Sequence, residues 1–213
     1  MTDARIIGGR AAALRFENLD TDQIMPKQFL RGIDKRGLAE GLLYDLRFDA
    51  TGAPRPDFVL NRPQYQGVNV LVGGNNFGCG SSREHAVWGL QQFGIQAVVA
   101  PSFGEIFYSN AMQNGLLLVM LDDALVRQLM VDSDNGGEVC IEITTMTLHS
   151  AHVSAEFVLA PRHRQMFLQG LDVIGMTLAQ RADITAFATA HWATQPWLEG
   201  IARHAREQAD RHS

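Results

Sequence analysis

Short apolar runs alternate with helical repeats from about residue 68 onward. Residues 68–72 are apolar and largely β-branched, as in a buried strand, and the apolar positions that follow recur at helical spacing until Gly94, a typical helix end. Those positions are Ala86, Val87, Leu90 and Phe93. The runs at 97–100 and 116–121 predict two more strands, separated by a helix that Gly115 ends. This β-α-β-α-β order predicts a partly parallel sheet with right-handed crossovers.

Two Ser-x-x-Glu patterns predict where the first two helices begin. Ser81 with Glu84, and Ser102 with Glu105, fit the capping box, in which the serine hydroxyl accepts a hydrogen bond from the first turn of a helix. We therefore expect each serine to cap the helix that follows it.

An antiparallel extension is predicted beyond the third strand. A short helix should run through Met130, and residues 134–137, which contain two glycines, predict a turn. Residues 138–143 then alternate between polar and apolar side chains, the period of a half-buried strand. Two further strands are expected at 146–153 and 157–159.

The two ends of the chain are less regular. The first 65 residues show no clear period, and residues 52–56, which read GAPRP, predict an exposed connection. Pro161 is placed to begin a helix, because proline is favoured in the first turn. We therefore predict a single domain over residues 1–213, with a helical C-terminal tail at about 161–213.

The composition indicates a folded protein without a membrane span. Hydrophobic residues make up 46% of the 213 residues, charged residues make up 19%, and the formal net charge is -5. The negative charge argues against a nucleic-acid partner, and no apolar run approaches the roughly 20 residues that cross a bilayer. The first residues lack a secretory pattern, so we expect a cytoplasmic location.

Neither the cysteines nor the histidines predict a metal site in this chain. Cys79 and Cys140 are the only cysteines, too few for a disulfide framework or a self-contained iron–sulfur cluster. Any cluster that takes part must therefore be held by another chain. Without a lowered thiol pKa, Cys79 is interpreted as a packing residue. His149, His152 and His163 lie on alternating strand and loop positions that do not converge.

The richest chemistry lies in residues 75–85, where a loop with two glycines enters a helix. The segment reads NNFGCGSSREH and sets the hydroxyls of Ser81 and Ser82 beside the guanidinium of Arg83. An arginine and the N–H groups at a helix start both favour an anion. The segment therefore predicts a site that binds an anion and removes a proton from it.

Two simpler explanations compete with this one. A serine before a helix can be its cap and glycines can serve only the turn, but two hydroxyls and an adjacent arginine exceed what capping requires. The pattern Gly78-x-Gly80-x-x-Arg83 lacks the third glycine of a dinucleotide fingerprint and the Lys-Ser/Thr ending of a P-loop. A phosphate-binding module is therefore the less favoured alternative.

Four sequence blocks, in order along nearly the whole chain, carry a family resemblance. They are NLDTDQI at 18–24, NFGCGSSREHA at 76–86, APSF at 100–103 with NGLL at 114–117, and GLD at 170–172 with PW at 196–197. Together they resemble the small subunits of 3-isopropylmalate dehydratases, in the aconitase family.

The resemblance implies a fold, a partner and a reaction. The implied fold is α/β, a swivelling β/β/α-type domain with a partly parallel central sheet and an antiparallel extension. The implied partner is the 3-isopropylmalate dehydratase large subunit, which holds a 4Fe-4S cluster whose iron binds the leaving hydroxyl; this chain itself would hold no cofactor. The implied reaction converts 2-isopropylmalate to 3-isopropylmalate by dehydration and rehydration through isopropylmaleate, in leucine biosynthesis.

The resemblance also assigns roles to the serine–arginine motif. Ser81 matches the catalytic base of the family, Ser82 a substrate-binding hydroxyl and Arg83 the clamp on a substrate carboxylate. A serine is a poor base unless its alkoxide is stabilised, which requires nearby positive charge. Arginine suits the clamp because its planar fork meets a carboxylate with two parallel hydrogen bonds.

Five further residues are candidates for the same site. Thr21 and Asp22 match the first active-site loop of the family, where Asp22 is expected to orient catalytic groups, although an Asx-type turn would also explain them. His85 is a candidate proton relay, or it only orients the loop. Lys27 and Arg31 are candidates for binding the second carboxylate, with a solvated surface charge as the alternative.

Some positions depart from the residues that are usual in bacterial small subunits, among them Val87, Gly89 and Leu118. None of them removes the serine–arginine motif, which also argues against an inactive scaffold. A relative that acts on another short substituted malate would keep the same loop. Hydration of citraconate or dimethylmaleate is therefore the alternative activity.

Overall fold

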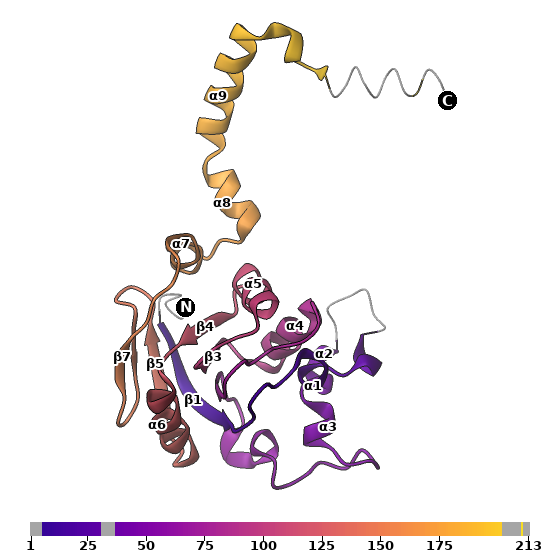
Figure 1. The fold of residues 1–213 in the computed structure, drawn as a ribbon, viewed down its shortest axis with the longest axis vertical. Coiled ribbons are helices and arrows are strands. Elements are labelled where there is room, and N and C mark those ends of the chain that lie inside the picture. The colour runs from indigo at the N-terminus through magenta and orange to yellow at the C-terminus, as the bar shows by residue number, and fades with distance from the viewer. Residues whose placement is uncertain (1–5, 31–36, 202–209, 211–213) are drawn as a thin grey trace. The chain divides into compact units, whose positions relative to one another are not determined.

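The computed structural model describes residues 6–30, 37–201 and 210, and a curled seven-stranded sheet with helices packed on it forms the main body (Figure 1). The chain divides into two compact units, Met1–Asp172 and Val173–Ser213. The first unit contains the whole sheet. The second contains α8 (Val173–Ala179), α9 (Arg181–Thr194) and the 3₁₀ turn Pro196–Leu198, none of which has a buried residue.

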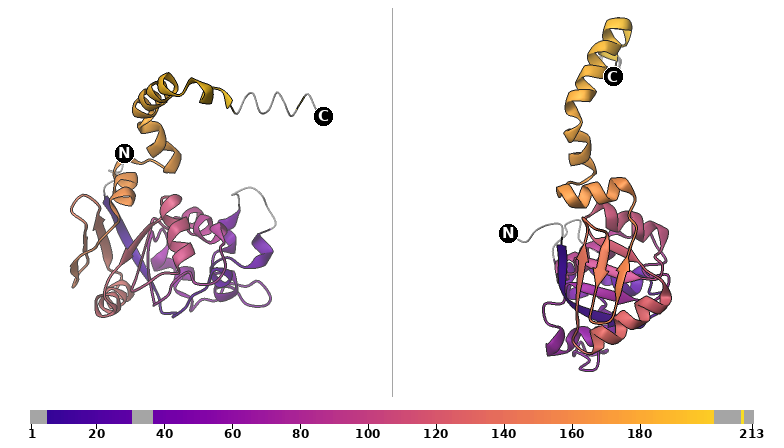
Figure 2. Two further views of the ribbon diagram at one scale, coloured as in Figure 1. Left: turned by 45° about the horizontal axis from the view of Figure 1, so that its top comes forward. Right: turned by 90° about the vertical axis from the view of Figure 1, so that its left-hand side faces the viewer.

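The sheet is part parallel and part antiparallel, as predicted, with the strand order β4-β3-β2-β1-β5-β6-β7. Strands β1 to β4 are mutually parallel, and β5 to β7 form the antiparallel extension, which faces the viewer in the right-hand view of Figure 2. Their bounds are β1 Ile6–Leu14, β2 Val70–Gly73, β3 Ala97–Ala100, β4 Leu117–Met120, β5 Glu138–Glu142, β6 Thr147–His149 and β7 Ser154–Glu156.

The central strand β1 has no counterpart among the predicted elements. It pairs in parallel with β2 and antiparallel with β5, so it joins the two halves of the sheet. Its sequence, IIGGRAAAL, is rich in glycine and alanine, which have low strand propensity. Ala11, Ala12 and Ala13 are nevertheless buried, because these small side chains let the helix α6 lie directly on β1.

The longer helices cover the two sides of the parallel strands. Figure 1 shows α4 and α5 together on one side of the sheet and α6 on the other. Their bounds are α4 Glu84–Phe93, α5 Glu105–Gln113 and α6 Asp123–Asp134. The remaining helices of the first unit are α1 Thr21–Ile24, α2 Leu38–Gly41, α3 Tyr44–Arg47, α7 Pro161–Gln169 and the 3₁₀ turns Lys27–Phe29, Val59–Asn61 and Pro63–Tyr65.

Some predicted helix boundaries are confirmed and others lie elsewhere. Gly94 ends α4 with a φ of 108°, and Pro161 begins α7. The short helix expected through Met130 continues one turn further, to Asp134. The single domain expected over residues 1–213 stays a prediction. Within the described ranges, no helix combines the length and apolar character needed to cross a bilayer.

The predicted capping box at Ser81 is wrong. Helix α4 begins only at Glu84, its N-cap is Arg83, and no side chain caps it. The carbonyl of Ser81 instead accepts hydrogen bonds from the N–H of Arg83 (2.8 Å) and from the Thr21 hydroxyl (3.0 Å). Ser81 thus belongs to the loop before the helix, and its main chain holds that loop together.

A buried carboxylate ties α6 to the antiparallel extension. Asp132 is 2% exposed and accepts hydrogen bonds from Ser150 Oγ (2.5 Å), from the N–H of His152 (3.0 Å), from His152 Nδ1 (2.7 Å) and from Gln128 Nε2 (3.1 Å). Burial by itself raises the pKa of Asp132, but these hydrogen bonds outweigh it and hold the pKa well below its usual value.

The same carboxylate explains a wrong strand boundary. A strand was predicted at 146–153, whereas β6 ends at His149 and β7 begins at Ser154. Residues 150–153 form the turn between them, where Ser150 accepts a hydrogen bond from Val153 and donates one to Asp132. Asp132 is distant in sequence, so the local pattern could not show this turn.

We expect Asp132→Asn to lower the free energy of unfolding by about 1.5–3 kcal/mol at pH 7, because charge-assisted hydrogen bonds are lost. The folded pKa of Asp132 lies below the unfolded value of about 3.9, so its contribution is present above about pH 4 and is lost as the pH falls further. Urea denaturation of both proteins from pH 7 to pH 3 should show the difference shrinking at the acidic end. Asp134→Asn is the matched control, because Asp134 makes only a half-exposed ion pair with Arg15. An equal effect of the two substitutions would contradict the interpretation.

Candidate active site

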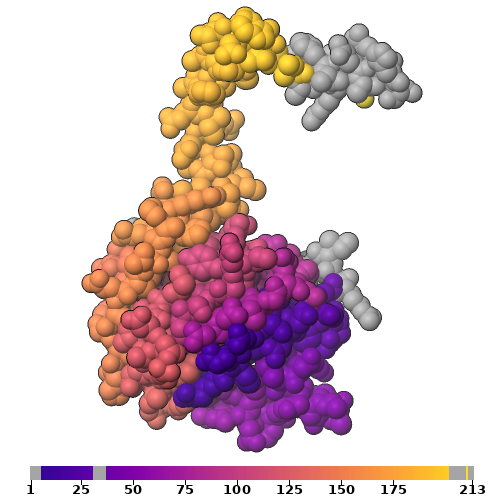
Figure 3. Space-filling model, viewed as in Figure 1, coloured from indigo at the N-terminus to yellow at the C-terminus, as the bar shows by residue number. Residues whose placement is uncertain are grey.

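The carboxyl ends of β1, β2 and β3 continue into loops that remain hydrogen-bonded to one another. Figure 3 shows the indigo and violet N-terminal residues beside the magenta residues that follow β2. The first loop pairs with the second through three main-chain hydrogen bonds: Asn18 N to Asn75 O (2.9 Å), Gly78 N to Leu19 O (2.7 Å) and Thr21 N to Cys79 O (2.9 Å). The parallel pairing of β1 with β2 therefore extends into the candidate site.

The third loop is joined to the second in the same way. Phe77 N donates to Ser102 O (3.1 Å), Gly104 N donates to Phe77 O (2.9 Å), and Asn76 N donates to Ser102 Oγ (2.8 Å). The capping box predicted at Ser102 is therefore wrong, since α5 begins at Glu105 after an N-cap glycine. Ser102 joins two loops instead of capping a helix.

An aromatic cluster of Phe77, Phe103 and Phe107 packs against the core side of the second loop. Phe77 is fully buried, and its ring centroid lies 6.2 Å from that of Phe103 and 5.6 Å from that of Phe107. Gly78 has a φ of 75°, and a β-carbon there would collide with the Phe107 ring. The loop can therefore lie this close to the core only with glycine at position 78.

The first loop is fixed by its own capping box and by Thr21. Asp20 Oδ1 accepts a hydrogen bond from the N–H of Gln23 (2.7 Å), while Gln23 Oε1 accepts one from the N–H of Asp20 (3.1 Å). Thr21 is 1% exposed, and its hydroxyl donates to the carbonyl of Ser81. Thr21 thus holds the two loops together, a position that favours support of the site over contact with a ligand.

Three charged candidates meet at the edge of the site. Arg83 Nη1 forms an ion pair with Asp22 Oδ1, and Lys27 Nζ lies 3.8 Å from Asp22 Oδ2. The Arg83 side chain is 22% exposed and that of Lys27 is 74% exposed. Asp22 therefore holds one edge of a largely buried guanidinium and makes only a long contact with an exposed ammonium. Arg31, also predicted to lie here, falls outside the described residues.

The two serines lie exposed just before α4. Within the described part of the chain, neither the Ser81 hydroxyl nor the Ser82 hydroxyl makes a hydrogen bond, while the main chain of Ser81 is held by Thr21 and Arg83. N–H groups of the first helical turn have no acceptor inside the helix. The loop thus presents a fixed backbone, two open hydroxyls and a guanidinium to one side.

His85 and Cys79 contribute to the walls of the site. The His85 ring lies 4.8 Å from the Trp88 ring, centroid to centroid, on the next turn of α4. Burial, followed by the charge of Asp20, raises the pKa of the Cys79 thiol, and Cys79 Sγ donates to the Asn18 carbonyl (3.3 Å). A raised pKa opposes a nucleophilic thiolate and supports the packing role predicted for Cys79.

Sequence reasoning missed the asparagines that brace these loops. Asn18 and Asn76 both have positive φ values, 53° and 54°, and Asn76 Nδ2 donates to Asn18 Oδ1 (2.9 Å). Asparagine tolerates this left-handed backbone better than other non-glycine residues. The two asparagines were visible in the family blocks, but only the fold shows that they meet.

No cluster of three or more histidine, cysteine, aspartate or glutamate side chains that could hold a metal occurs within the residues described. His152 is engaged with Asp132, and the ring of His163 lies 6.0 Å from that of Tyr108. The donor set for an iron–sulfur cluster is thus not found in the described part of this chain.

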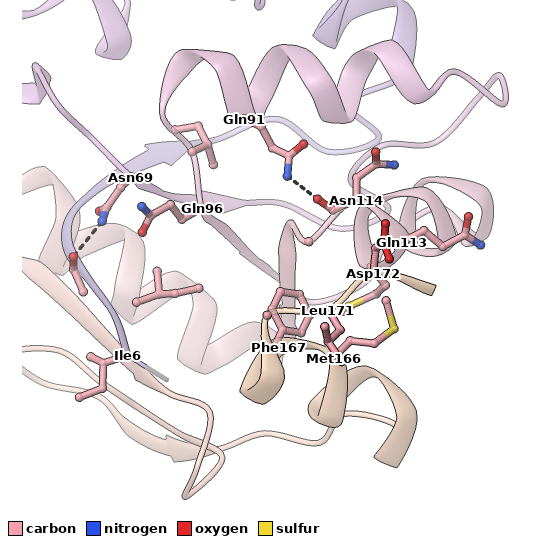
Figure 4. A pocket seen from close by; sticks show the side chains of 16 residues that line it. Ile6, Asn69, Gln91, Gln96, Gln113, Asn114, Met166, Phe167, Leu171 and Asp172 are labelled. Atoms are coloured by element: carbon pink, nitrogen blue, oxygen red, sulfur yellow. Dashed lines mark hydrogen bonds between the residues drawn. The ribbon is translucent and has the colours of Figure 1, made fainter. Parts of the chain in front are cut away.

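A large cavity lies at the other end of the parallel strands. It measures about 1040 Å³ and is bordered by residues at the amino ends of the strands, such as Asn69, Gln96 and Gly115, and by α7 (Figure 4). Among the described residues that line it, apolar and amide side chains predominate, and Asp172 is the only charged one. A site for a dicarboxylate needs cations, so the loop edge is the better candidate despite the size of this cavity.

Known proteins resemble the chain over nearly its whole length. The family described as Aconitase C-terminal domain matches residues 5–124, which include both loops of the site. The 3-isopropylmalate dehydratase small subunit 1 of Chromobacterium violaceum is 60% identical over 204 residues, covering 95% of this chain and 96% of that one. The 3-isopropylmalate dehydratase small subunit of Phenylobacterium zucineum is 50% identical, with 91% and 97% covered.

A solved structure agrees with these relatives. The crystal structure of a 3-isopropylmalate dehydratase from Methanocaldococcus jannaschii is similar with a TM-score of 0.59 and 28% sequence identity, covering 86% of this chain and 99% of that one. Fold and sequence therefore lead to the same conclusion. The chain belongs to the aconitase family and, within it, to the 3-isopropylmalate dehydratase small subunits.

Proposed function

We propose that this chain is the small subunit of a cytoplasmic, heteromeric hydro-lyase that converts 2-isopropylmalate to 3-isopropylmalate by dehydration and rehydration through isopropylmaleate, in leucine biosynthesis. The observation that carries the proposal is the site at the start of α4. There a largely buried guanidinium, oriented by Asp22, lies beside two exposed hydroxyls on a backbone fixed by hydrogen bonds. This arrangement suits a substrate with a carboxylate next to an acidic C–H bond.

Ser81 acts as the base in this proposal. Removing a proton next to a carboxylate leaves a doubly charged aci-carboxylate, so positive potential is needed where that charge grows. Arg83 and the first-turn N–H groups of α4 supply it from this chain, and they also stabilise the alkoxide of Ser81. The proton taken from carbon then stays on Ser81 Oγ until rehydration returns it.

Arg83 clamps the substrate carboxylate, with Ser82 as a further hydrogen-bond donor. Because Asp22 occupies one edge of the guanidinium, the remaining N–H groups point in a defined direction. Asp22 in this way orients the clamp, while Lys27 and Arg31 are assigned to the second carboxylate. His85, held against Trp88, is assigned to proton relay.

The large subunit supplies the Lewis acid. The described part of this chain has no donor set for a metal, so we assign the 4Fe-4S cluster, which would activate the leaving hydroxyl, to that partner. A related hydratase of citraconate or dimethylmaleate would use the same loop, but the relatives named above favour the isopropylmalate reaction.

The chain alone should be inactive, and anaerobic reconstitution with a cluster-loaded large subunit should restore isopropylmaleate hydration. Assays on a panel of substituted malates would identify the substrate, with isopropylmalate expected to give the highest kcat/KM. Turnover by the purified, iron-free chain would refute the proposal that activity requires the large subunit and its cluster. A higher kcat/KM for citraconate or dimethylmaleate hydration would favour the alternative activity over the isopropylmalate reaction.

Ser81→Ala should lower kcat of the reconstituted complex by about 10²-fold or more, the usual loss for a positioned acid–base group. The fold and subunit association should persist, because only the main chain of Ser81 is hydrogen-bonded in the described structure. Ser154→Ala, on the exposed edge strand β7, is the control and should keep full activity. If Ser81→Ala retained more than a tenth of the wild-type kcat, Ser81 would not be the catalytic base.

Arg83→Lys should lower kcat/KM by roughly tenfold to a hundredfold despite the retained charge, because lysine cannot hold Asp22 and a substrate carboxylate with one planar fork. Steady-state kinetics of the reconstituted variant test this. If KM and kcat were both unchanged, positive charge alone would suffice and the clamp would be wrong.

A further inference from the structure

We infer that Asn114 is a positioning residue that fixes helix α4, and with it the candidate active site at the start of that helix. The inference rests on the function proposed above. Asn114 lies directly after α5, some thirty residues from the serine–arginine motif, and it makes no contact with that motif among the interactions described.

Asn114 contacts three successive turns of α4. Its Nδ2 donates to Glu84 Oε1 (2.6 Å), its Oδ1 accepts from Trp88 Nε1 (2.9 Å), and its main-chain carbonyl accepts from Gln91 Nε2 (2.7 Å), the last of which is drawn in Figure 4. Positions 84, 88 and 91 lie on one face of a helix. One residue therefore sets both the rotation of α4 about its axis and its position along that axis.

The chemistry of these neighbours requires an amide at position 114. An ionised carboxylate such as Glu84 only accepts hydrogen bonds, and the indole N–H of Trp88 only donates. A side chain between them must donate to one and accept from the other, which aspartate, lysine and leucine cannot do. The second Nδ2 hydrogen of Asn114 goes to the carbonyl of Asn110 (2.8 Å), so the amide is fully used.

The two α4 partners of the Asn114 side chain adjoin proposed site residues. Glu84 directly follows Arg83, the N-cap of α4, and Trp88 supports the ring of His85. A shift of α4 would therefore move the guanidinium and the imidazole together. Misplacement of catalytic groups by about 1 Å can cost on the order of 10² in rate.

Exchanging the hydrogen-bond donor and acceptor tests the inference in the reconstituted complex. Asn114→Asp keeps the size of the side chain and its acceptor for Trp88, but turns a second carboxylate toward Glu84. Adding Glu84→Gln restores a donor opposite an acceptor. Gln113→Glu is the matched control, since it makes the same amide-to-acid change at the neighbouring exposed residue, whose amide bonds only to Ser109 of the same helix.

We expect Asn114→Asp to lower kcat roughly tenfold to a hundredfold, the double variant to recover most of that loss, and Gln113→Glu to stay within about twofold of wild type. Rescue by the exchanged pair is the result that a loss of general stability would not give. Wild-type turnover in Asn114→Asp, or a double variant no better than the single one, would overturn the inference.

Amide hydrogen exchange on the full chain separates this inference from the proposed function, because it needs no turnover. Exchange in the first two turns of α4 should be faster in Asn114→Asp and should return to wild type in the double variant. An inactive wild-type complex would refute the proposed function, while unchanged exchange would refute the role of Asn114. If Asn114→Asp does not fold, Trp88→Phe replaces it, since that change keeps an aromatic ring beside His85 and removes the N–H donor to Asn114; unchanged exchange in α4 would again refute the inference.

Discussion

The main-chain pairing between residues 18–21 and 75–79 is the constraint on which the candidate site depends. Parallel strands end at the same edge of a sheet, and here β1 and β2 do more than end together, since their loops continue to exchange hydrogen bonds past the strands. Thr21 and Ser81 are 60 residues apart in sequence and are joined directly by a side-chain bond to main chain. A site divided over two distant segments is thereby held by main-chain hydrogen bonds and by the Thr21 side chain, while the hydroxyls of Ser81 and Ser82 remain open for a ligand.

The charges at this edge are arranged so that one carboxylate limits the repulsion between two cations without cancelling them. Asp22 is close to both Arg83 and Lys27, but only Arg83 is substantially buried. The desolvated guanidinium therefore has a partner before any substrate arrives, which avoids the cost of an isolated buried charge. Asp22 offsets only part of the charge of Arg83 and Lys27, and the guanidinium N–H groups that it does not hold can receive an incoming carboxylate. The cavity at the opposite end of the strands offers volume, but its described lining contains an aspartate, Asp172, and no lysine or arginine to bind such a substrate.

Much of the fold follows from local sequence pattern, and the exceptions depend on contacts between residues that are far apart in the sequence. The strands β2, β3 and β4 were predictable because their apolar, mostly branched residues alternate with helical repeats. Strand β1 was not, because glycine and alanine fill it and only packing against α6 makes it a buried strand. The serine–arginine motif was evident as chemistry, whereas Ser81 was wrongly expected to cap α4. The residues that sequence reasoning missed, Asn18, Asn76 and Asn114, are amides whose partners lie far away along the chain.

Helix α4 links the two ends of the parallel strands, and this explains why a residue remote from the motif can matter to it. A hydrogen-bonded helix moves as a nearly rigid element, so a contact at its second or third turn fixes its first turn as well. Close packing strengthens the effect at Gly89, where a β-carbon would displace the terminal methyl group of Met25, a residue that directly follows α1. Glycine at position 89 lets the Met25 side chain lie directly against α4. The helix is thus located from one side by Met25 and from another by Asn114, and the site at its start takes its position from both.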